Sequence, residues 1–170
     1  MTNQIDIGGG WLCLIDITEH VHINELNTRI NASDESFDGS LCISKTNITT
    51  EIYNNIDAII RQYGIRRLMF GSCTIDNISK FVSMIFNITL SELHIGRCDD
   101  IDDNNFAYIS DALSINTQLT SLQLYCNGMN TDGFKSIMKT MTINTTIKEL
   151  IISGRYPHPY NAANIIIETI

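Results

Sequence analysis

The chain has 170 residues, of which 44% are hydrophobic, and this is enough for one ordinary soluble domain with a substantial core. The net charge is −8, and the 11 Lys and Arg residues are scattered with no basic run longer than the pair Arg66 and Arg67, which disfavours nucleic acid binding through phosphate neutralisation. No apolar run approaches the ~20 residues of a membrane span. The start, MTNQIDIGGG, lacks the charged and apolar segments of a signal peptide, so we expect a cytoplasmic protein.

The cysteines support the same expectation. They are odd in number and widely spaced, without a CxxC pair: Cys13, Cys42, Cys73, Cys98 and Cys126. A small secreted domain usually has an even set of cysteines that pair as disulfides. We therefore expect reduced thiols in an intracellular, reducing compartment.

Residues 1–40 show the weakest pattern. The segment Trp11, Leu12, Leu14 and Ile17 indicates a strand, and the apolar residues between 21 and 26 fit either a second strand or a short helix. Residues 31–40, NASDESFDGS, are typical of a loop. We interpret residues 1–40 as a degenerate first repeat that caps the end of a stack.

From residue 12 onward, pairs of apolar residues separated by one position recur along the chain. The pairs are Leu12 and Leu14, Leu41 and Ile43, Leu68 and Phe70, Leu93 and Ile95, Leu122 and Leu124, and Leu150 and Ile152. Successive pairs are 29, 27, 25, 29 and 28 residues apart. A period in the high twenties is typical of a repeat architecture in which each unit contributes one strand.

Helical patterns lie between these strands. Apolar residues are spaced i, i+3, i+7 in three sets, which are Ile78, Phe81 and Ile85, then Phe106, Ile109 and Leu113, then Phe134, Ile137 and Met141. A looser apolar face runs from Ile52 to Tyr63 and ends at Gly64. We expect helix starts at Asp76, Asp103 and Thr131 or Asp132. We expect helix ends at Asn87, Asn116 and Asn144, where Asn tolerates the left-handed conformation.

Two segments carry a resemblance to a known family. The sequences LSELHIGRC (90–98) and NTQLTSLQLYCN (116–127) resemble the ribonuclease-inhibitor-like class of leucine-rich repeats, and are similar to the repeats of cytosolic nucleotide-binding innate-immune receptors. The resemblance covers roughly residues 41–155 and implies an α/β fold: a right-handed solenoid, or horseshoe segment, of about five to six repeats. It further implies a parallel sheet on the concave side and helices on the convex side.

The sequence departs from the family pattern at two places. One extra residue before Ile101 predicts that Asp99, Asp100, Asp102 and Asp103 bulge from a turn. Arg155 then replaces the expected Asn or Cys, and two prolines flank His158, so the regular turn is lost there. We assign residues 156–170 to a C-terminal cap helix whose Ile165, Ile166, Ile167 and Ile170 either close the stack or meet another chain.

The positions around each inner pair form the candidate functional surface. In the LxxLxL frame the inner residues point into the core and the intervening residues point outward, while Cys73, Cys98 and Asn127 are expected to hold turns from buried positions. Aromatic and Met side chains gain most from desolvation at interfaces. We therefore select five candidate partner-binding residues, Met69, His94, Gln123, Tyr125 and Ile151. The alternative is that they are merely exposed.

Other site types have weaker patterns. His20 and His22 form an HxH pair without an evident third metal ligand, the aspartates near residue 100 lack the arrangement of a calcium loop, and Gly8, Gly9 and Gly10 precede a strand rather than a helix. No Ser-His-Asp or Cys-His arrangement can be assigned. We expect no enzymatic activity, metal or cofactor.

The expected function is binding of a protein partner by the concave face. One alternative is a homo-oligomer joined through the solenoid ends and the Ile-rich C-terminus. Another is a viral or parasite mimic of host repeat proteins, because richness in Ile and Asn is typical of AT-rich genomes.

Overall fold

The computed structural model describes residues 4–18, 21–32, 37–87, 89–98, 100–127, 129 and 131–154. The strands within these residues are β1 (Gln4–Gly8), β2 (Trp11–Ile15), β3 (Ser40–Ser44), β4 (Asn47–Ile48), β5 (Arg67–Gly71), β6 (Thr74–Ile75), β7 (Glu92–Gly96), β8 (Ser121–Asn127) and β9 (Glu149–Gly154). The helices are α1 (Ile23–Ala32), α2 (Thr50–Tyr63), α3 (Ile78–Asn87), α4 (Asp103–Ile115) and α5 (Thr131–Met141).

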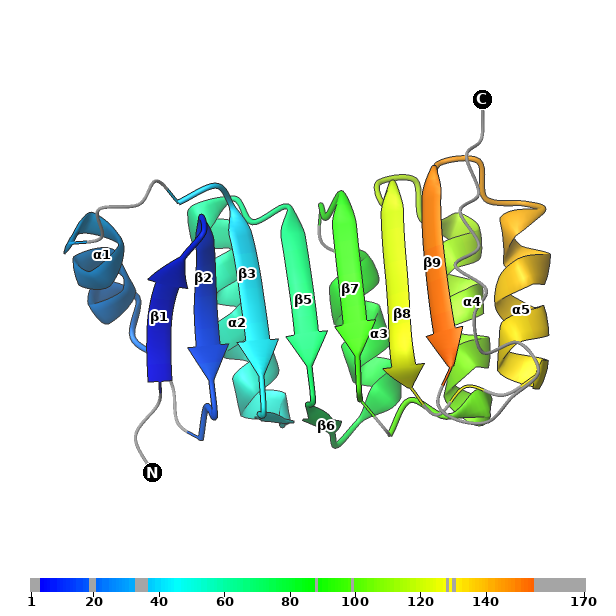
Figure 1. The fold of residues 1–170 in the computed structure, drawn as a ribbon, viewed down its shortest axis with the longest axis horizontal. Coiled ribbons are helices and arrows are strands. Elements are labelled where there is room, and N and C mark those ends of the chain that lie inside the picture. The colour runs from blue at the N-terminus through cyan, green and yellow to red at the C-terminus, as the bar shows by residue number, and fades with distance from the viewer. Residues whose placement is uncertain are drawn as a thin grey trace.

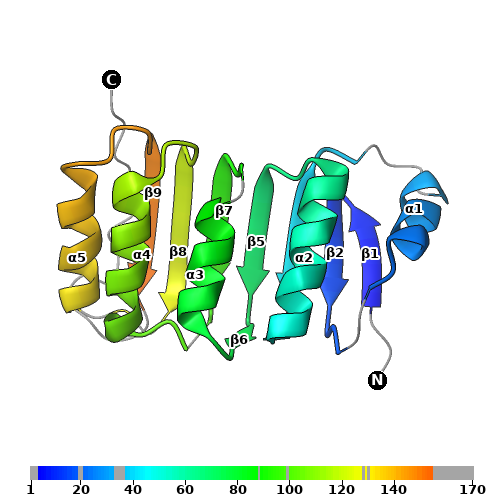
Figure 2. The same ribbon diagram turned by 180° about the vertical axis from the view of Figure 1, so that it is seen from behind.

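Seven strands form one sheet in the order β1-β2-β3-β5-β7-β8-β9, and β4 pairs separately with β6. From β2 to β9 every neighbouring pair of the large sheet is parallel. Helices α2 to α5 all lie on one side of it, behind the strands in Figure 1 and in front of them in Figure 2. The expected α/β fold with a parallel sheet is confirmed.

The inner apolar pairs lie in register across the sheet. One row joins Leu12, Leu41, Leu68, Leu93, Leu122 and Leu150, and a second joins Leu14, Ile43, Phe70, Ile95, Leu124 and Ile152. All twelve side chains are buried. Each such side chain stabilises the fold by about 1.5–3 kcal/mol relative to an exposed one, so these rows are a main source of stability.

The helices cover these rows with the residues that the periodicity selected. Phe81, Ile85, Phe106, Ile109 and Leu113 are buried, whereas Ile78, at the start of α3, is partly buried. In α5 only Ile137 of the expected set is buried, while Phe134 and Met141 are partly buried, because α5 is the last described helix of the layer. Helix α2 ends as expected at Gly64, which has φ +60°.

The residues expected to cap the helix starts were displaced by one position in two cases. Asn77, not Asp76, caps α3, because its side chain accepts a hydrogen bond from the Lys80 N–H (2.9 Å). Asp102, not Asp103, caps α4 by accepting from the Asn105 N–H (3.2 Å). A capping residue must lie just before the first helical residue to reach these amides. Asp76 and Asn77 are adjacent, as are Asp102 and Asp103, so the sequence did not show which of the two is the cap. Helix α5 begins at Thr131, and the position before it, where its cap would lie, is outside the described residues.

Asn116 and Asn144 follow helices as expected, but for a different reason. Asn116 has φ −75° and ψ 130°, which is extended rather than left-handed. Its side chain accepts from the N–H groups of Gln118 (3.0 Å) and Leu119 (2.8 Å). Asn144 likewise accepts from two backbone N–H groups, and donates to the carbonyls of Leu113 (2.7 Å) and Asn116 (3.0 Å). These side chains satisfy buried backbone groups where helix turns into strand, which Asn does well because it both donates and accepts.

The strand ends share one turn geometry. The residue directly after β2, β3, β5 and β7 is Asp16, Lys45, Ser72 and Arg97 respectively, and each has a positive φ between 51° and 57°. Each donates its N–H to the end of the next strand of the sheet, as Lys45 does to the Gly71 carbonyl (3.0 Å). This repeated left-handed residue turns the chain away from the sheet at equivalent places.

Buried polar side chains follow directly after these turns. Cys73 and Cys98 are buried, as the sequence predicted, and their thiols donate to the carbonyls of Gly71 and Gly96 (both 3.6 Å). Thr46 takes the same position after β3 and donates to the Ser44 carbonyl (2.9 Å). Thr46 was missed because a hydroxyl is not part of the Asn or Cys pattern. The side chain of Asn127 lies outside the described residues.

The N-terminal region differs most from expectation. Strand β1, which was not predicted, pairs antiparallel with β2 through a two-residue turn. Gly9 and Gly10 have φ +59° and +84°, the positive values that a tight hairpin turn requires. The segment with two interpretations forms helix α1, which extends two residues into the expected loop and ends at Ala32. Strand β2 thus pairs parallel with β3 in the same register as the later strands, and β1 covers the other edge of β2.

Candidate binding surface

The sheet side opposite helices α2 to α5 carries every other strand residue, and no helix of the described ranges covers it (Figure 1). We call this surface the open face. Its row at the strand starts contains Trp11, Ser40, Arg67, Glu92, Ser121 and Glu149. Its middle row contains Cys13, Cys42, Met69, His94, Gln123 and Ile151, and its last row contains Ile15, Ser44, Gly71, Gly96, Tyr125 and Ser153.

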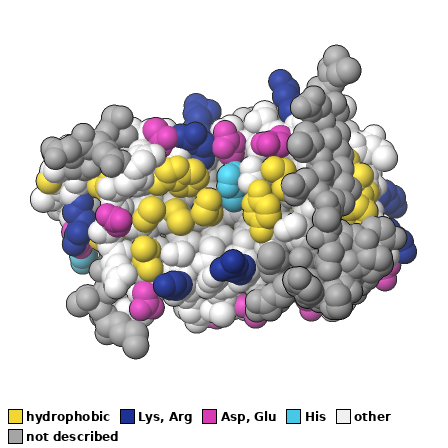
Figure 3. Space-filling view, viewed as in Figure 1, with side chains coloured by type: hydrophobic (Ala, Val, Ile, Leu, Met, Phe, Trp, Pro, Cys, Tyr) yellow, Lys and Arg dark blue, Asp and Glu magenta, His cyan; other side chains and the backbone are white. Residues whose placement is uncertain are grey.

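All five candidate residues lie on the open face. Met69, His94, Gln123 and Ile151 occupy the same register position on four consecutive strands, β5, β7, β8 and β9. Tyr125 lies two residues after Gln123, and its hydroxyl donates to the Gln123 side-chain oxygen (2.7 Å). All five are partly buried. Figure 3 shows hydrophobic side chains gathered across the middle of this side, with charged side chains along its upper edge.

Three sulfur-containing side chains lie side by side in the middle row of the open face, and we call them the sulfur patch: Cys13, Cys42 and Met69. The Cys42 thiol lies 3.8 Å from the Met69 sulfur. Burial raises the pKa of the Cys13 thiol, and it raises the pKa of Cys42 to about 12. Both thiols are therefore neutral at physiological pH, so the patch is apolar and polarizable rather than a reactive thiolate pair.

The guanidinium of Arg67 is occupied within the chain. It forms an ion pair with Asp38, donates from Nε to the Ser40 hydroxyl (2.7 Å), and lies 5.8 Å from the centre of the Trp11 ring. All three partners lie on the β2 and β3 side of Arg67. The cation therefore points away from β7, the strand on its other side.

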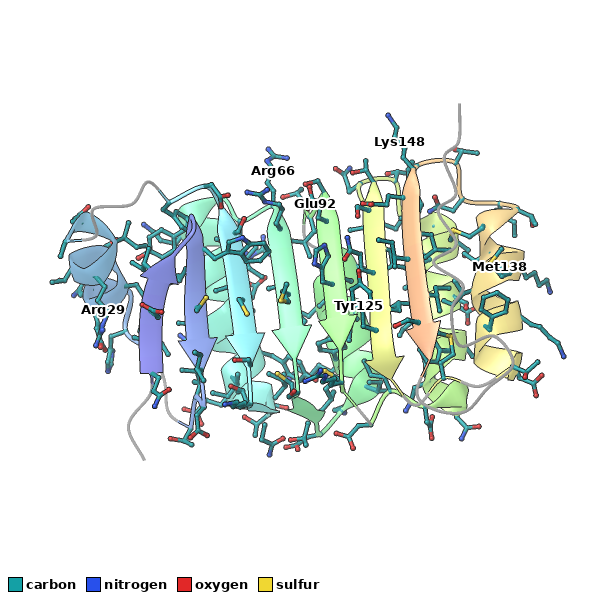
Figure 4. The ribbon with its side chains drawn as sticks, in the orientation of Figure 1. Arg29, Arg66, Glu92, Tyr125, Met138 and Lys148 are labelled. Carbon is teal, nitrogen blue, oxygen red and sulfur yellow. The ribbon has the colours of Figure 1, made fainter. Side chains whose placement is uncertain are left out.

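Carboxylates dominate the remaining charge of the open face. Among its described strand positions Asp6, Glu92 and Glu149 are acidic, and Arg67 is the one basic residue. Glu149 accepts a hydrogen bond from the Ser121 hydroxyl (2.6 Å). In Figure 4, Glu92 lies on the strands, whereas Arg66 and Lys148 extend away from the sheet at the edge where the strands begin. The open face therefore has an excess of negative charge near β7 and β9.

His94 lies between the sulfur patch and these carboxylates. Its Nε2 atom is buried without a hydrogen-bond partner. Burial lowers the pKa of His94, while Glu92 and Glu149 partly oppose that shift. The imidazole is therefore neutral at pH 7.

A pocket lies where β2 and β3 end. This pocket of about 590 Å³ is lined in part by Asp16, Lys45, Thr46, Thr49 and Glu51. Its threonines serve the fold, since Thr46 accepts from the Ile17 N–H (3.1 Å) and Thr49 caps α2 by accepting from the Ile52 N–H (3.3 Å). The pocket therefore has fewer polar groups available for a ligand than its lining suggests.

The helix layer also exposes apolar side chains. Ile115 and Ile143 directly precede Asn116 and Asn144, and they are 82% and 61% exposed. They are isolated large residues of a kind common on protein surfaces. Substitutions at these two positions can therefore serve as controls for substitutions of apolar residues on the open face.

The aspartates near residue 100 serve the structure where they are described. Asp100 accepts from the Ile75 N–H (2.8 Å), Asp102 caps α4, and Asp103 is the first residue of that helix. In the described ranges no three His, Cys, Asp or Glu residues are grouped to hold a metal. Several predictions lie outside the described residues, namely those on His20, Asp99, Arg155, Ile165, Ile166, Ile167 and Ile170.

The chain was compared with known families, curated proteins and solved structures. None of them matches. The candidate surface is therefore defined by its own geometry. In addition, no helix in the described part of the chain is long and apolar enough to cross a membrane.

Proposed function

We propose that the chain is a non-enzymatic interaction module that binds a protein partner through the open face. We further propose that it is a leucine-rich repeat solenoid of the ribonuclease-inhibitor-like class, with the open face on its concave side. The in-register strand rows and the helices on a single side of the sheet support the solenoid assignment.

One observation supports the binding role above all. Met69, His94, Gln123 and Ile151 form a continuous row of partly buried, largely uncharged side chains on four adjacent strands, beside the sulfur patch. Surfaces of this composition resemble the centres of protein interfaces, where aromatic and Met side chains replace most charged ones. The row is held by a rigid sheet, so little ordering entropy opposes binding.

The test is affinity purification from cells followed by mass spectrometry, with the wild type and three variants. Met69→Asp and Tyr125→Asp place a charge on the open face and should reduce partner recovery at least tenfold. Ile115→Asp changes an equally apolar but exposed residue on the helix layer, and should leave recovery unchanged. Circular dichroism should show the same fold for all four proteins. Partners that survive both open-face substitutions but are lost with Ile115→Asp would contradict the proposal.

Self-association is a second candidate function. Strand β9 is the last strand of the described sheet, and an edge strand presents unpaired backbone groups to another chain. Sedimentation at high protein concentration measures this directly, and a monomer would remove the candidate. The free thiols of the four described cysteines fit the proposed reducing, cytoplasmic location.

A further inference from the structure

We propose that the partner presents a Lys or Arg side chain beside an apolar side chain, with the cation at Glu92 and the apolar group on the sulfur patch. This inference rests on the proposed function, because it specifies the partner of the same open face. It follows from the ion pair that Arg67 forms with Asp38 rather than with its cross-strand neighbour Glu92.

The first step concerns Glu92. Arg67 is its direct neighbour across the parallel pair of β5 and β7. A cross-strand pair of opposite charge is normally favourable. Here the guanidinium instead turns toward Asp38, Ser40 and Trp11, so no ion pair joins the two residues among the described contacts. Among the described residues, Glu92 therefore has no ion-pair partner.

The second step concerns the charge around Glu92. Glu149 lies two strands away in the same row, and both carboxylates act on His94 in the direction that raises its pKa. The whole chain carries a net charge of −8. A cationic group of a partner is thus attracted over a long range and finds the Glu92 carboxylate at short range, with Glu149 roughly 10 Å away at about 4.8 Å per strand. An acidic partner segment is repelled.

The third step concerns the apolar half of the motif. Met69 lies one strand and two residues from Glu92, which corresponds to roughly 8 Å across the sheet, given about 4.8 Å between strands and 3.3 Å along them. Side chains two residues apart in an extended peptide are separated by about 7 Å. One extended segment can therefore place a basic side chain at Glu92 and an apolar one at Met69, Cys42 and Cys13. The neutral thiols keep this patch apolar across the physiological pH range.

Neutral His94 fits between the two groups. It lies beside Met69 on the neighbouring strand and two residues after Glu92. The ring is neutral and half-buried, so it adds no positive charge that would oppose a basic side chain at Glu92. The three adjacent positions thus offer a carboxylate, a neutral ring and an apolar patch in sequence.

The experiment selects random 12-residue peptides by phage display on the immobilised full chain. The expected result is enrichment of Lys or Arg within two positions of an aromatic or aliphatic residue. Selection on the double variant Glu92→Gln and Glu149→Gln should lose the basic enrichment and keep the apolar one. Glu51→Gln is the matched control, because it removes an exposed carboxylate on α2 and should leave the enrichment unchanged.

A synthetic peptide from the selection then gives a double-mutant cycle. Replacing its basic residue by Gln should weaken binding to the wild type by up to about fivefold, in line with partly exposed ion pairs, and should not weaken binding to the double variant. The loss should shrink as salt is raised, because ions screen exposed charges. Equal weakening on both proteins would overturn the proposal.

The remaining outcomes separate this inference from the proposed function. Peptides that depend on Met69 but lack Lys and Arg would overturn the inference alone. Failure to select any peptide, or selection insensitive to every open-face variant, would overturn both. A wild-type dimer that Met69→Asp converts to monomer would show that a second copy occupies the open face, which also overturns the inference.

Discussion

The two sides of the sheet use the same strands in opposite ways. On the helix side every one of the twelve in-register positions is Leu, Ile or Phe, and all are buried. On the open face the middle row alone contains Cys, Met, His, Gln and Ile. Packing against helices accepts only apolar side chains of similar size, so the helix side is uniform. The open face is free of that constraint, and its variety provides the means for recognition.

The largest expected effect is the difference in stability between an alanine substitution on the helix side and one at a nearby position on the open face. Leu93→Ala should lower the free energy of unfolding by about 2–5 kcal/mol, because it leaves a cavity between Leu68 and Leu122 in a fully buried row. Gln123→Ala, one strand away on the open face, should change it by less than about 1 kcal/mol. Urea denaturation followed by circular dichroism measures both. Similar losses for the two variants would contradict the division of roles between the sides.

The next prediction concerns the accessibility of thiols on the two sides. Cys13 and Cys42 on the open face should react with iodoacetamide in the native protein, whereas Cys73 and Cys98 are buried and should be protected until the chain unfolds. Because the pKa values of Cys13 and Cys42 are raised, labelling should be slow at pH 7 and rise about tenfold per pH unit up to pH 9. Peptide mapping by mass spectrometry follows each site. Rapid labelling of Cys73 would show that the helix side opens easily.

The smallest expected effect concerns His94. The pKa of its imidazole is lowered in the folded chain, so between that value and about 6.5 the unfolded chain binds a proton that the folded chain does not. The free energy of unfolding is therefore unaffected by His94 protonation above about pH 6.5. It declines as the pH falls from there toward the pKa of His94 in the folded chain. The groups that act on it are Glu92, Glu149 and Arg67. His94→Gln should flatten this part of the stability profile, as measured by urea denaturation at pH 5, 6 and 7.5. If the variant shows the same change of stability between pH 5 and pH 7.5 as the wild type, groups other than His94 cause that pH dependence.

The sequence predicted the parts of the fold that depend on repeated apolar spacing. Leu68, Leu93 and Leu122 each open an inner pair, and their alignment follows from the period and from strand alternation. The same alternation predicted which residues point outward, including Met69 and Tyr125. Asymmetric features were missed. The hairpin of β1 was signalled only by Gly9 and Gly10 in a segment without the repeat pattern.

The charge arrangement of the open face could not be predicted from spacing. Arg67 and Glu92 occupy equivalent positions in successive strands, which suggests a cross-strand pair. Asp38 lies in the segment before β3 and takes the guanidinium of Arg67 instead. Asp38 and Arg67 are 29 residues apart in the sequence. Their contact depends on how the chain packs in three dimensions, which the spacing of residues within one repeat does not specify.

The antiparallel strand β1 has a consequence for how such a chain can lengthen. A duplicated strand and helix can be inserted between any two parallel neighbours from β2 to β9, because each insertion meets the same partner direction on both sides. On the far side of β2 the position is already filled by a strand running the opposite way. Added repeats can therefore be accommodated between the parallel strands, whereas the hairpin end stays constant.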